Sequence, residues 1–105
     1  MQTISIETRK GGDTWVANGI GAAMQIRHPD ACEAVLVLDE NSKLVGRDAD
    51  PEVAVGQCIE QAVENPLSGL TLSPDLRGLP ARALGHLAIH DGMPGVRIIE
   101  KGQSR

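Results

Sequence analysis

The sequence predicts a small α+β domain, in which a mostly antiparallel sheet of about five strands packs against one long helix. Three observations lead to this class. Short segments rich in Ile, Val and Leu occur near both ends of the chain and in its middle. One segment, residues 51–64, carries apolar residues at helical spacing. Glycine and proline punctuate the intervals between these segments. With 105 residues, the chain is long enough for one core, so residues 1–105 are expected to form a single domain.

The residue pattern of the N-terminal quarter of the chain predicts three short strands. Residues 2–8 alternate apolar and polar side chains, as a half-buried strand does. Gly11 and Gly12 then favour a tight turn, which makes residues 14–17 the return strand. A break or bulge is expected at residues 18–21. A third strand over residues 22–27 should end before Pro29, because the residue before a proline is restricted and prolines seldom continue a strand.

Residues 34–46 predict a hairpin. Residues 34–38 are continuously apolar, which is typical of a central strand covered on both faces. Residues 39–42 supply turn chemistry, with Asn41 expected to adopt the left-handed conformation. Leu44 and Val45 begin the return strand.

The long helix is expected over residues 51–64. Asp50 is a favoured N-cap, Pro51 occupies the first helical position, and the charge of Glu52 complements the helix dipole. One helix face is apolar and is expected to pack on Leu36 and Leu38 through Val55, Ile59 and Ala62. The opposite face is acidic and includes Glu60 and Glu64, which are candidates for contact with a partner.

The C-terminal third is less regular. Residues 67–80 are loop-like, with a short strand expected at 70–72. Residues 81–90 predict a shorter second helix, and residues 96–100 a last strand. The polar residues 101–105 are expected to form a frayed tail.

Composition narrows the classes of function. The formal net charge is −4 and Trp15 is the only aromatic residue, so direct nucleic-acid binding is disfavoured: phosphate repels an acidic surface, and aromatic stacking on bases is scarce. No segment approaches the about 20 apolar residues of a membrane span, and the N-terminus does not resemble a signal peptide. Two cysteines do not make a disulfide framework. We therefore expect a cytoplasmic protein with reduced thiols and no membrane contact.

One constellation could bind a metal ion. His86 and His90 are four residues apart, so a helix would place both imidazoles on one face, with Asp91 as an adjoining carboxylate. The HExxH pattern of zinc proteases is not present, because Leu87 occupies the glutamate position. The alternative interpretation is a pair of surface histidines near a helix C-terminus, where positive charge is favourable.

We expect a small acidic, non-enzymatic binding or regulatory protein that docks on a larger macromolecule, in the manner of an inhibitor or an antitoxin, phage-encoded inhibitors included. Trp15, Glu60 and Glu64 are its expected contact residues, and a position in the core is the equal alternative for Trp15. No cofactor is expected. A homodimer is expected, with the N-terminal or the 34–46 hairpin at the contact. One alternative is a metal-dependent or small-molecule-binding enzyme subunit that uses His86, His90 and Asp91. Another is a structural or assembly component.

The segment "TWVA", residues 14–17, followed later by a helix, resembles the order of elements in HicB antitoxins, whose second strand has a similar pattern. This chain departs from that pattern in two ways. Its segment between the hairpin and the helix is far longer, and the usual glycine-cysteine loop is missing. No family is assigned from it.

Overall fold

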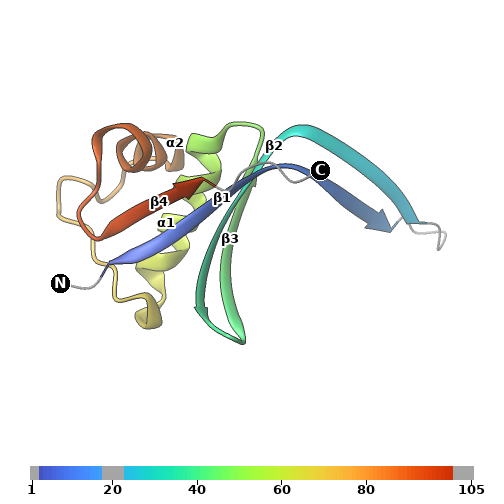
Figure 1. The fold of residues 1–105 in the computed structure, drawn as a ribbon. Coiled ribbons are helices and arrows are strands. Elements are labelled where there is room, and N and C mark those ends of the chain that lie inside the picture. Colours follow the sequence, from blue (N-terminus) through green and yellow to red (C-terminus); the bar gives the residue numbers. More distant parts are fainter. Residues whose placement is uncertain (1–2, 18–22, 101–105) are drawn as a thin grey trace.

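A computed structural model describes residues 3–17 and 23–100, and of residues 10–30 within these ranges only the backbone. These residues form a small α+β domain, as predicted: a four-stranded sheet with helices on one of its faces (Figure 1). In chain order the elements are β1 (Ile4–Ala17), β2 (Ala23–Asp39), β3 (Ser42–Asp48), α1 (Pro51–Glu64), the 3-10 turn η1 (Pro66–Ser68), α2 (Ala81–His86), the π-helical turn η2 (Leu87–Asp91) and β4 (Val96–Glu100).

The sheet has the order β3-β2-β1-β4 and is mixed rather than antiparallel throughout. β2 runs antiparallel to both β1 and β3, whereas β4 runs parallel to β1, with Ile4 opposite Val96 and Thr8 opposite Glu100. The parallel pairing arises because the chain crosses over through the helices before it returns to the sheet. The expectation of about five strands in a mostly antiparallel sheet is corrected in these two respects.

The strand count differs because two predicted interruptions lie inside long strands. The glycine pair at residues 11–12 does not turn the chain; the β1–β2 register shifts between Lys10 and Gly12, and β1 continues. Pro29 does not end a strand either. It lies in a bulge within β2, where residues 29–31 are opposite Gly11 alone. Such bulges accept residues that a regular ladder cannot. The predicted break at residues 18–21 lies outside the described residues, as does the predicted tail 101–105.

The predicted hairpin at residues 34–46 is confirmed. β2 and β3 pair with Ala34 opposite Gly46 and Leu36 opposite Leu44. Its turn does not use a left-handed asparagine, since no described residue other than glycine has a positive φ. Instead, Asp39 Oδ1 accepts a hydrogen bond from the Asn41 backbone N–H at 2.8 Å, an Asx-type turn.

The long helix is confirmed with the predicted boundaries. Asp50 accepts a hydrogen bond from the Glu52 N–H at 2.9 Å, and Pro51 is the first helical residue. The buried face of α1 packs on the inner sheet face, and the core includes the residues predicted to meet there. The fully or nearly buried members on the sheet and α1 are Ile4, Ile6, Cys32, Ala34, Leu36, Ala54, Val55, Cys58, Ile59 and Ala62, with Leu38 packed against them and partly buried. Leu70, Leu72, Leu84, Ala88 and Met93 complete the core.

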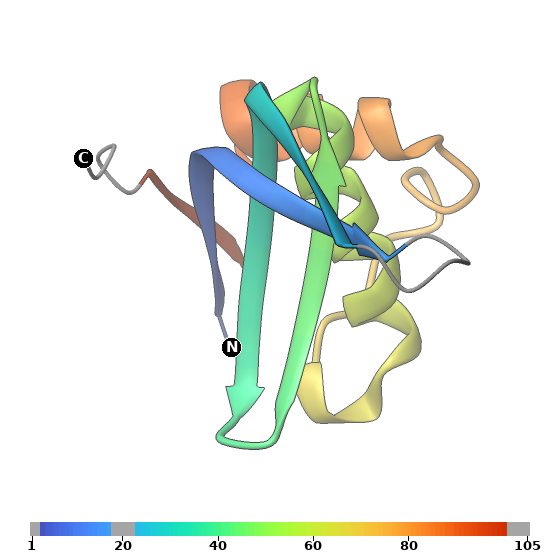
Figure 2. The same ribbon diagram turned by 90° about the vertical axis from the view of Figure 1, so that its right-hand side faces the viewer.

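The prediction that residues 34–38 form a strand covered on both faces holds only for part of this segment of β2. Val35 is buried on the face away from the helix, but Val37, two residues on, has an exposed fraction of 59%. The side of the sheet away from the helices is visible in Figure 2, where no described helix covers it.

The outer edge of β3 is protected by α1. Gln61 Nε2 donates to the Val45 carbonyl at 2.7 Å, and Gln57 Oε1 accepts from the Arg47 N–H at 3.0 Å. The two side-chain amides satisfy backbone groups that an edge strand would otherwise present to another chain.

The second helical segment exists, but its geometry changes at its midpoint. α2 is α-helical to His86, and the chain then widens into the π-helical turn η2. Residues 70–72, expected as a strand, are irregular, although Leu70 and Leu72 are buried. None of the helices within the described ranges is long and apolar enough to span a bilayer.

Neither cysteine forms a disulfide, and both are buried. Cys58 lies in the apolar face of α1, and burial raises the pKa of its thiol to about 11.

Candidate functional site

Three titratable side chains meet where the start of α1 faces α2 and η2. Glu52 Oε2 lies 2.8 Å from His86 Nδ1 and 3.1 Å from His90 Nε2, so one carboxylate oxygen contacts both imidazoles. The three potential ligand atoms lie within 4.8 Å of one another. We refer to Glu52, His86 and His90 as the EHH cluster.

The backbone of α1 holds Glu52 in place. Asp50 caps the helix and at the same time forms an ion pair with Arg82 of α2. Glu52 therefore lies in a first helical turn that is fixed at its start and tied to the neighbouring helix.

Glycines allow the two helices to approach at this point. A Cβ atom on Gly85 would lie 1.7 Å from the Glu52 carbonyl oxygen, and one on Gly56 would lie 1.7 Å from the Ala81 carbonyl oxygen. Neither position tolerates a side chain without movement. The contact places the residue after Gly85, which is His86, beside the side chain of Glu52.

The change from α- to π-helix occurs between the two histidines. The imidazole centroids of His86 and His90 are 4.8 Å apart and inclined by 48°. A single π-helical turn alters the angle between successive side chains, and such turns are frequent at functional sites.

The electrostatics of the EHH cluster follow from its contacts. The hydrogen bond with His86 lowers the pKa of Glu52 below its usual range. The same hydrogen bond raises the pKa of His86, and the charge of Asp91 adds to this shift. Both shifts favour a carboxylate next to an imidazolium near pH 5 to 6.

A cleft of about 610 Å³ opens beside the cluster. Glu52 and His90 form part of its wall, together with the apolar side chains of Ile89 and Ile98 and the polar residues Thr8, Asp50 and Glu100. The cleft therefore combines proton-exchanging groups with an apolar surface and has an acidic rim. Such a combination can bind a cation or a small polar molecule.

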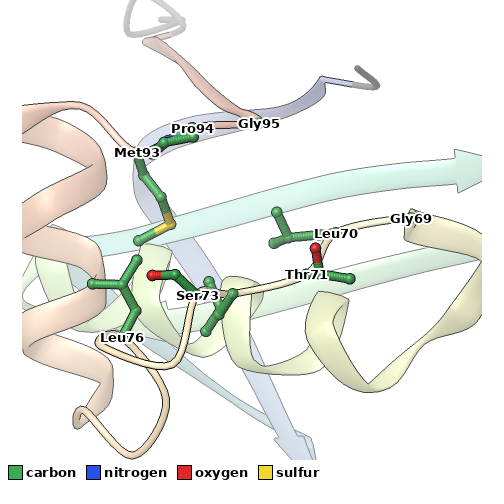
Figure 3. Close-up of a pocket in the computed structure, with 9 residues that line it drawn as sticks. Gly69, Leu70, Thr71, Ser73, Leu76, Met93, Pro94 and Gly95 are labelled. Carbon is green, nitrogen blue, oxygen red and sulfur yellow. The ribbon is translucent and has the colours of Figure 1, made fainter.

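A second hollow, of about 370 Å³, lies between residues 69–76 and 93–95 (Figure 3). In Figure 3, the Met93 side chain points toward Leu76, with Leu70 on the other side of the hollow. The remaining lining residues are glycine, proline, leucine and two hydroxyl residues, Thr71 and Ser73. This lining carries no group that titrates near neutral pH, so the EHH cluster is the stronger candidate for chemistry.

The predicted site residues are distributed over three regions. His86 and His90 come together as the sequence predicted, but their carboxylate neighbour is Glu52. Asp91 acts on His86 through its charge and is not part of the cluster. Glu60 and Glu64 are exposed on α1, where they line a cleft together with Leu72 and Leu84. The side chain of Trp15 lies outside the described part of the structure.

Sequence reasoning missed Glu52 as a site residue. Its position in the first turn of a helix was explained by the helix dipole alone. Glu52 and His86 are 34 residues apart in the chain, and no spacing pattern connects residues on two different helices. Only the packing of α1 against α2 joins them.

The backbone of Trp15 belongs to the most extended feature of the fold. Residues 12–17 of β1 and 23–28 of β2 pair with each other from Gly12–His28 to Ala17–Ala23. The described pairings of β4 end at Thr8 of β1, and those of β3 begin at Cys32 of β2. We call residues 12–17 and 23–28 the β arm. It projects beyond the helices (Figure 1), and the molecule measures 47 × 26 × 25 Å.

Searches of the chain against protein-family models, curated protein sequences and solved structures give no significant match.

Proposed function

We propose that this protein is a non-enzymatic binding or regulatory protein that docks on a larger protein partner through its β arm. The observation that carries the proposal is the projection of the arm beyond the rest of the fold. Its six residue pairs span about 20 Å at a rise of about 3.3 Å per residue.

Physical chemistry gives a reason for such an arm to bind. A two-stranded ribbon alone is at best marginally stable in water, because it lacks a packed face. The arm also has two free strand edges along its length within the described pairings. The register places Trp15 opposite Gln25, Val16 opposite Met24 and Thr14 opposite Ile26, a high share of apolar residues for an isolated ribbon. Contact with another macromolecule would stabilise it.

Charge adds a second requirement on the partner. The described arm residues include one acidic and one basic residue, Asp13 and Arg27, so the excess negative charge of the chain lies elsewhere. Glu60 and Glu64 contribute to it on the exposed side of α1. A partner with an apolar or strand-like contact for the arm and basic residues beside it would complement both surfaces.

A second copy of the chain is the other occupant that the arm favours, because two-fold symmetric dimers are the commonest soluble oligomers and the arm of each copy would present the same strand edges. Protection of the β3 edge by Gln57 and Gln61 makes the 34–46 hairpin the weaker contact. Sedimentation at several micromolar concentrations distinguishes these cases: a homodimer gives twice the 11.1 kDa mass of the chain, and a foreign partner alone leaves a monomer.

The proposal is tested by affinity capture from the native host with an arm-shortened variant. Residues 11–31 are replaced by Asn-Gly, which joins Lys10 and Cys32, a directly opposed pair, by a two-residue hairpin turn. The proposal predicts that the wild-type chain retains a specific protein and that the shortened chain, folded by far-UV circular dichroism, loses it.

The matched control is the double variant Glu60→Gln, Glu64→Gln, which keeps the arm and removes two exposed charges. It should retain the partner with weaker, more slowly formed binding. Retention of the same partner by the shortened chain at unchanged affinity would refute a role for the arm.

A further inference from the structure

We propose that Glu52, His86 and His90 form a binding site for one divalent transition-metal ion of the zinc class. The site is independent of the β arm and of the proposed docking function. Its ligands come from two helical segments, with Glu52 on α1, His86 at the end of α2 and His90 in η2.

The two distances from the carboxylate to the imidazoles are close to those of a metal shell. Zinc bonds to nitrogen and oxygen are about 2.0–2.1 Å, so two ligand atoms of a tetrahedral shell lie about 3.4 Å apart. Glu52 Oε2 lies 2.8 Å from His86 Nδ1 and 3.1 Å from His90 Nε2, a few tenths of an ångström less. The three ligand atoms lie within 4.8 Å of one another, so an ion between them would require the two imidazoles to rotate toward each other and the carboxylate to move outward slightly.

Access and mobility favour entry of an ion. The side chains of His86 and His90 are each 53% exposed, whereas that of Glu52 is 22% exposed. The carboxylate is therefore the fixed member, anchored in the first turn of α1, and the imidazoles have room to rotate toward a shared ion.

The donor set selects the class of metal. Two imidazole nitrogens and one carboxylate oxygen suit zinc, cobalt and nickel better than magnesium or calcium, which prefer all-oxygen shells. Three protein ligands also leave a coordination position for water or another molecule. Glu52 and His90 line the adjacent cleft, which can admit such a molecule.

Protons compete with the metal for these atoms. In the metal-free arrangement, both ring nitrogens donate to Glu52 Oε2, so His86 carries its proton on Nδ1. Coordination requires this nitrogen to lose that proton, either to the other ring nitrogen or to solvent. Affinity should therefore fall as the pH drops below the pKa of His86. The charged groups around the cluster are Asp91, Glu100 and the Asp50–Arg82 ion pair, and the net acidic surroundings favour a cation.

The test is calorimetric titration of the chelator-treated full chain with ZnCl₂ at pH 7.5, accompanied by the absorption spectrum of the Co²⁺ form. We expect one ion per chain and a cobalt spectrum typical of nitrogen and oxygen ligands. Loss of a group that only supports a ligand lowers metal affinity by about 10–100-fold. His86→Ala and His90→Ala should each exceed that loss, and Glu52→Gln should also weaken binding.

The third histidine of the chain, His28, provides the matched control, because it lies in the β arm. His28→Ala should bind zinc like the wild type. If a cluster variant does not fold, the wild-type cobalt spectrum decides: a thiolate charge-transfer band would assign the ion to a cysteine and overturn the proposal. It would also be overturned by the absence of saturable zinc binding to the wild-type chain, or by binding that His86→Ala and His90→Ala leave unchanged.

Discussion

Gly85 brings the backbones of α1 and α2 into contact at the point where Glu52 meets the two histidines. A Cβ atom there would lie 1.7 Å from the Glu52 carbonyl oxygen. An alanine normally stabilises a helix relative to glycine by about 1 kcal/mol. Here the steric conflict with a backbone atom outweighs this preference, because a backbone carbonyl cannot rotate away.

We predict that Gly85→Ala lowers the free energy of unfolding by about 1–3 kcal/mol, the range for overpacked sites. Urea unfolding followed by circular dichroism measures this loss. Gly85→Ser adds one further atom at the same point and should cost at least as much. An alanine variant as stable as the wild-type chain would show that the helices separate easily at this contact.

The Glu52–His86 pair predicts a defined pH dependence of stability. The raised pKa of His86 gives stabilisation that is present below its ordinary value of 6.5 and is lost as the pH rises through the folded-state pKa. The lowered pKa of Glu52 gives stabilisation that is present above 4.5 and is lost as the pH falls through its folded-state pKa. The pair therefore contributes most between about pH 4.5 and 6.5.

His86→Gln should accordingly lose more stability at pH 5.5 than at pH 8, when urea midpoints are compared with those of the wild-type chain in the presence of a chelator. The effect is small, because the pair is solvent-exposed. His28→Gln serves as the control for a histidine outside the cluster. An equal loss at both pH values would contradict the assignment of the pKa shifts.

At the scale of single residues, the sequence predicted local relationships and missed distant ones. The spacing of His86 and His90 placed both on one side of a helical segment, since residues four apart are neighbours on a helix surface. The participation of Glu52 could not be predicted, because it depends on the crossing of two helices. That crossing in turn depends on Gly56 and Gly85, which let the helices approach because they lack a side chain. The spacing of apolar residues in the sequence does not reveal this role.

The start of α1 is the element whose boundary the sequence predicted best. Asp50 accepts from the Glu52 N–H, and it also pairs with Arg82. We predict that Asp50→Ala lowers the free energy of unfolding by about 1 kcal/mol through loss of the cap. Asp50→Asn keeps a good capping side chain and removes only the exposed ion pair, which contributes about 0–1 kcal/mol. Thermal unfolding of the two variants separates the contribution of the cap from that of the ion pair. Equal losses of stability in the two variants would mean that the cap contributes little.

The strands were harder to predict than the helix. The hairpin at residues 34–46 was predicted correctly because apolar runs and a polar turn segment, residues 39–42, occur together there. The glycine pair at 11–12 and Pro29 indicated chain reversals, yet both lie at one irregularity of the β1–β2 ladder. A bulge and a turn draw on the same residue types, so local composition does not distinguish them. β4 is parallel to β1 because of the path that the chain takes through the helices between β3 and β4. A local sequence pattern does not predict this path either.

At the scale of the whole molecule, the fold separates a packed body from an extended arm. The body contains the core, the covered β3 edge and the EHH cluster, and its stability comes from the packing of α1 on the sheet. The β arm has only its own two strands to support it within the described pairings. If both proposals hold, partner binding belongs to the arm and metal binding to the body, so loss of one should leave the other intact.

Amide hydrogen exchange of the β arm tests the central claim most directly. In the free monomer, reached by dilution if the chain self-associates, the amides of residues 12–17 and 23–28 should exchange faster than those of the core strand segments 4–6 and 34–36. In the complex with the captured partner, or in the dimer, the arm amides should become strongly protected while the core amides change little. Arm amides that exchange at the same rate in the free and the bound protein would contradict the proposal that the arm is the docking element.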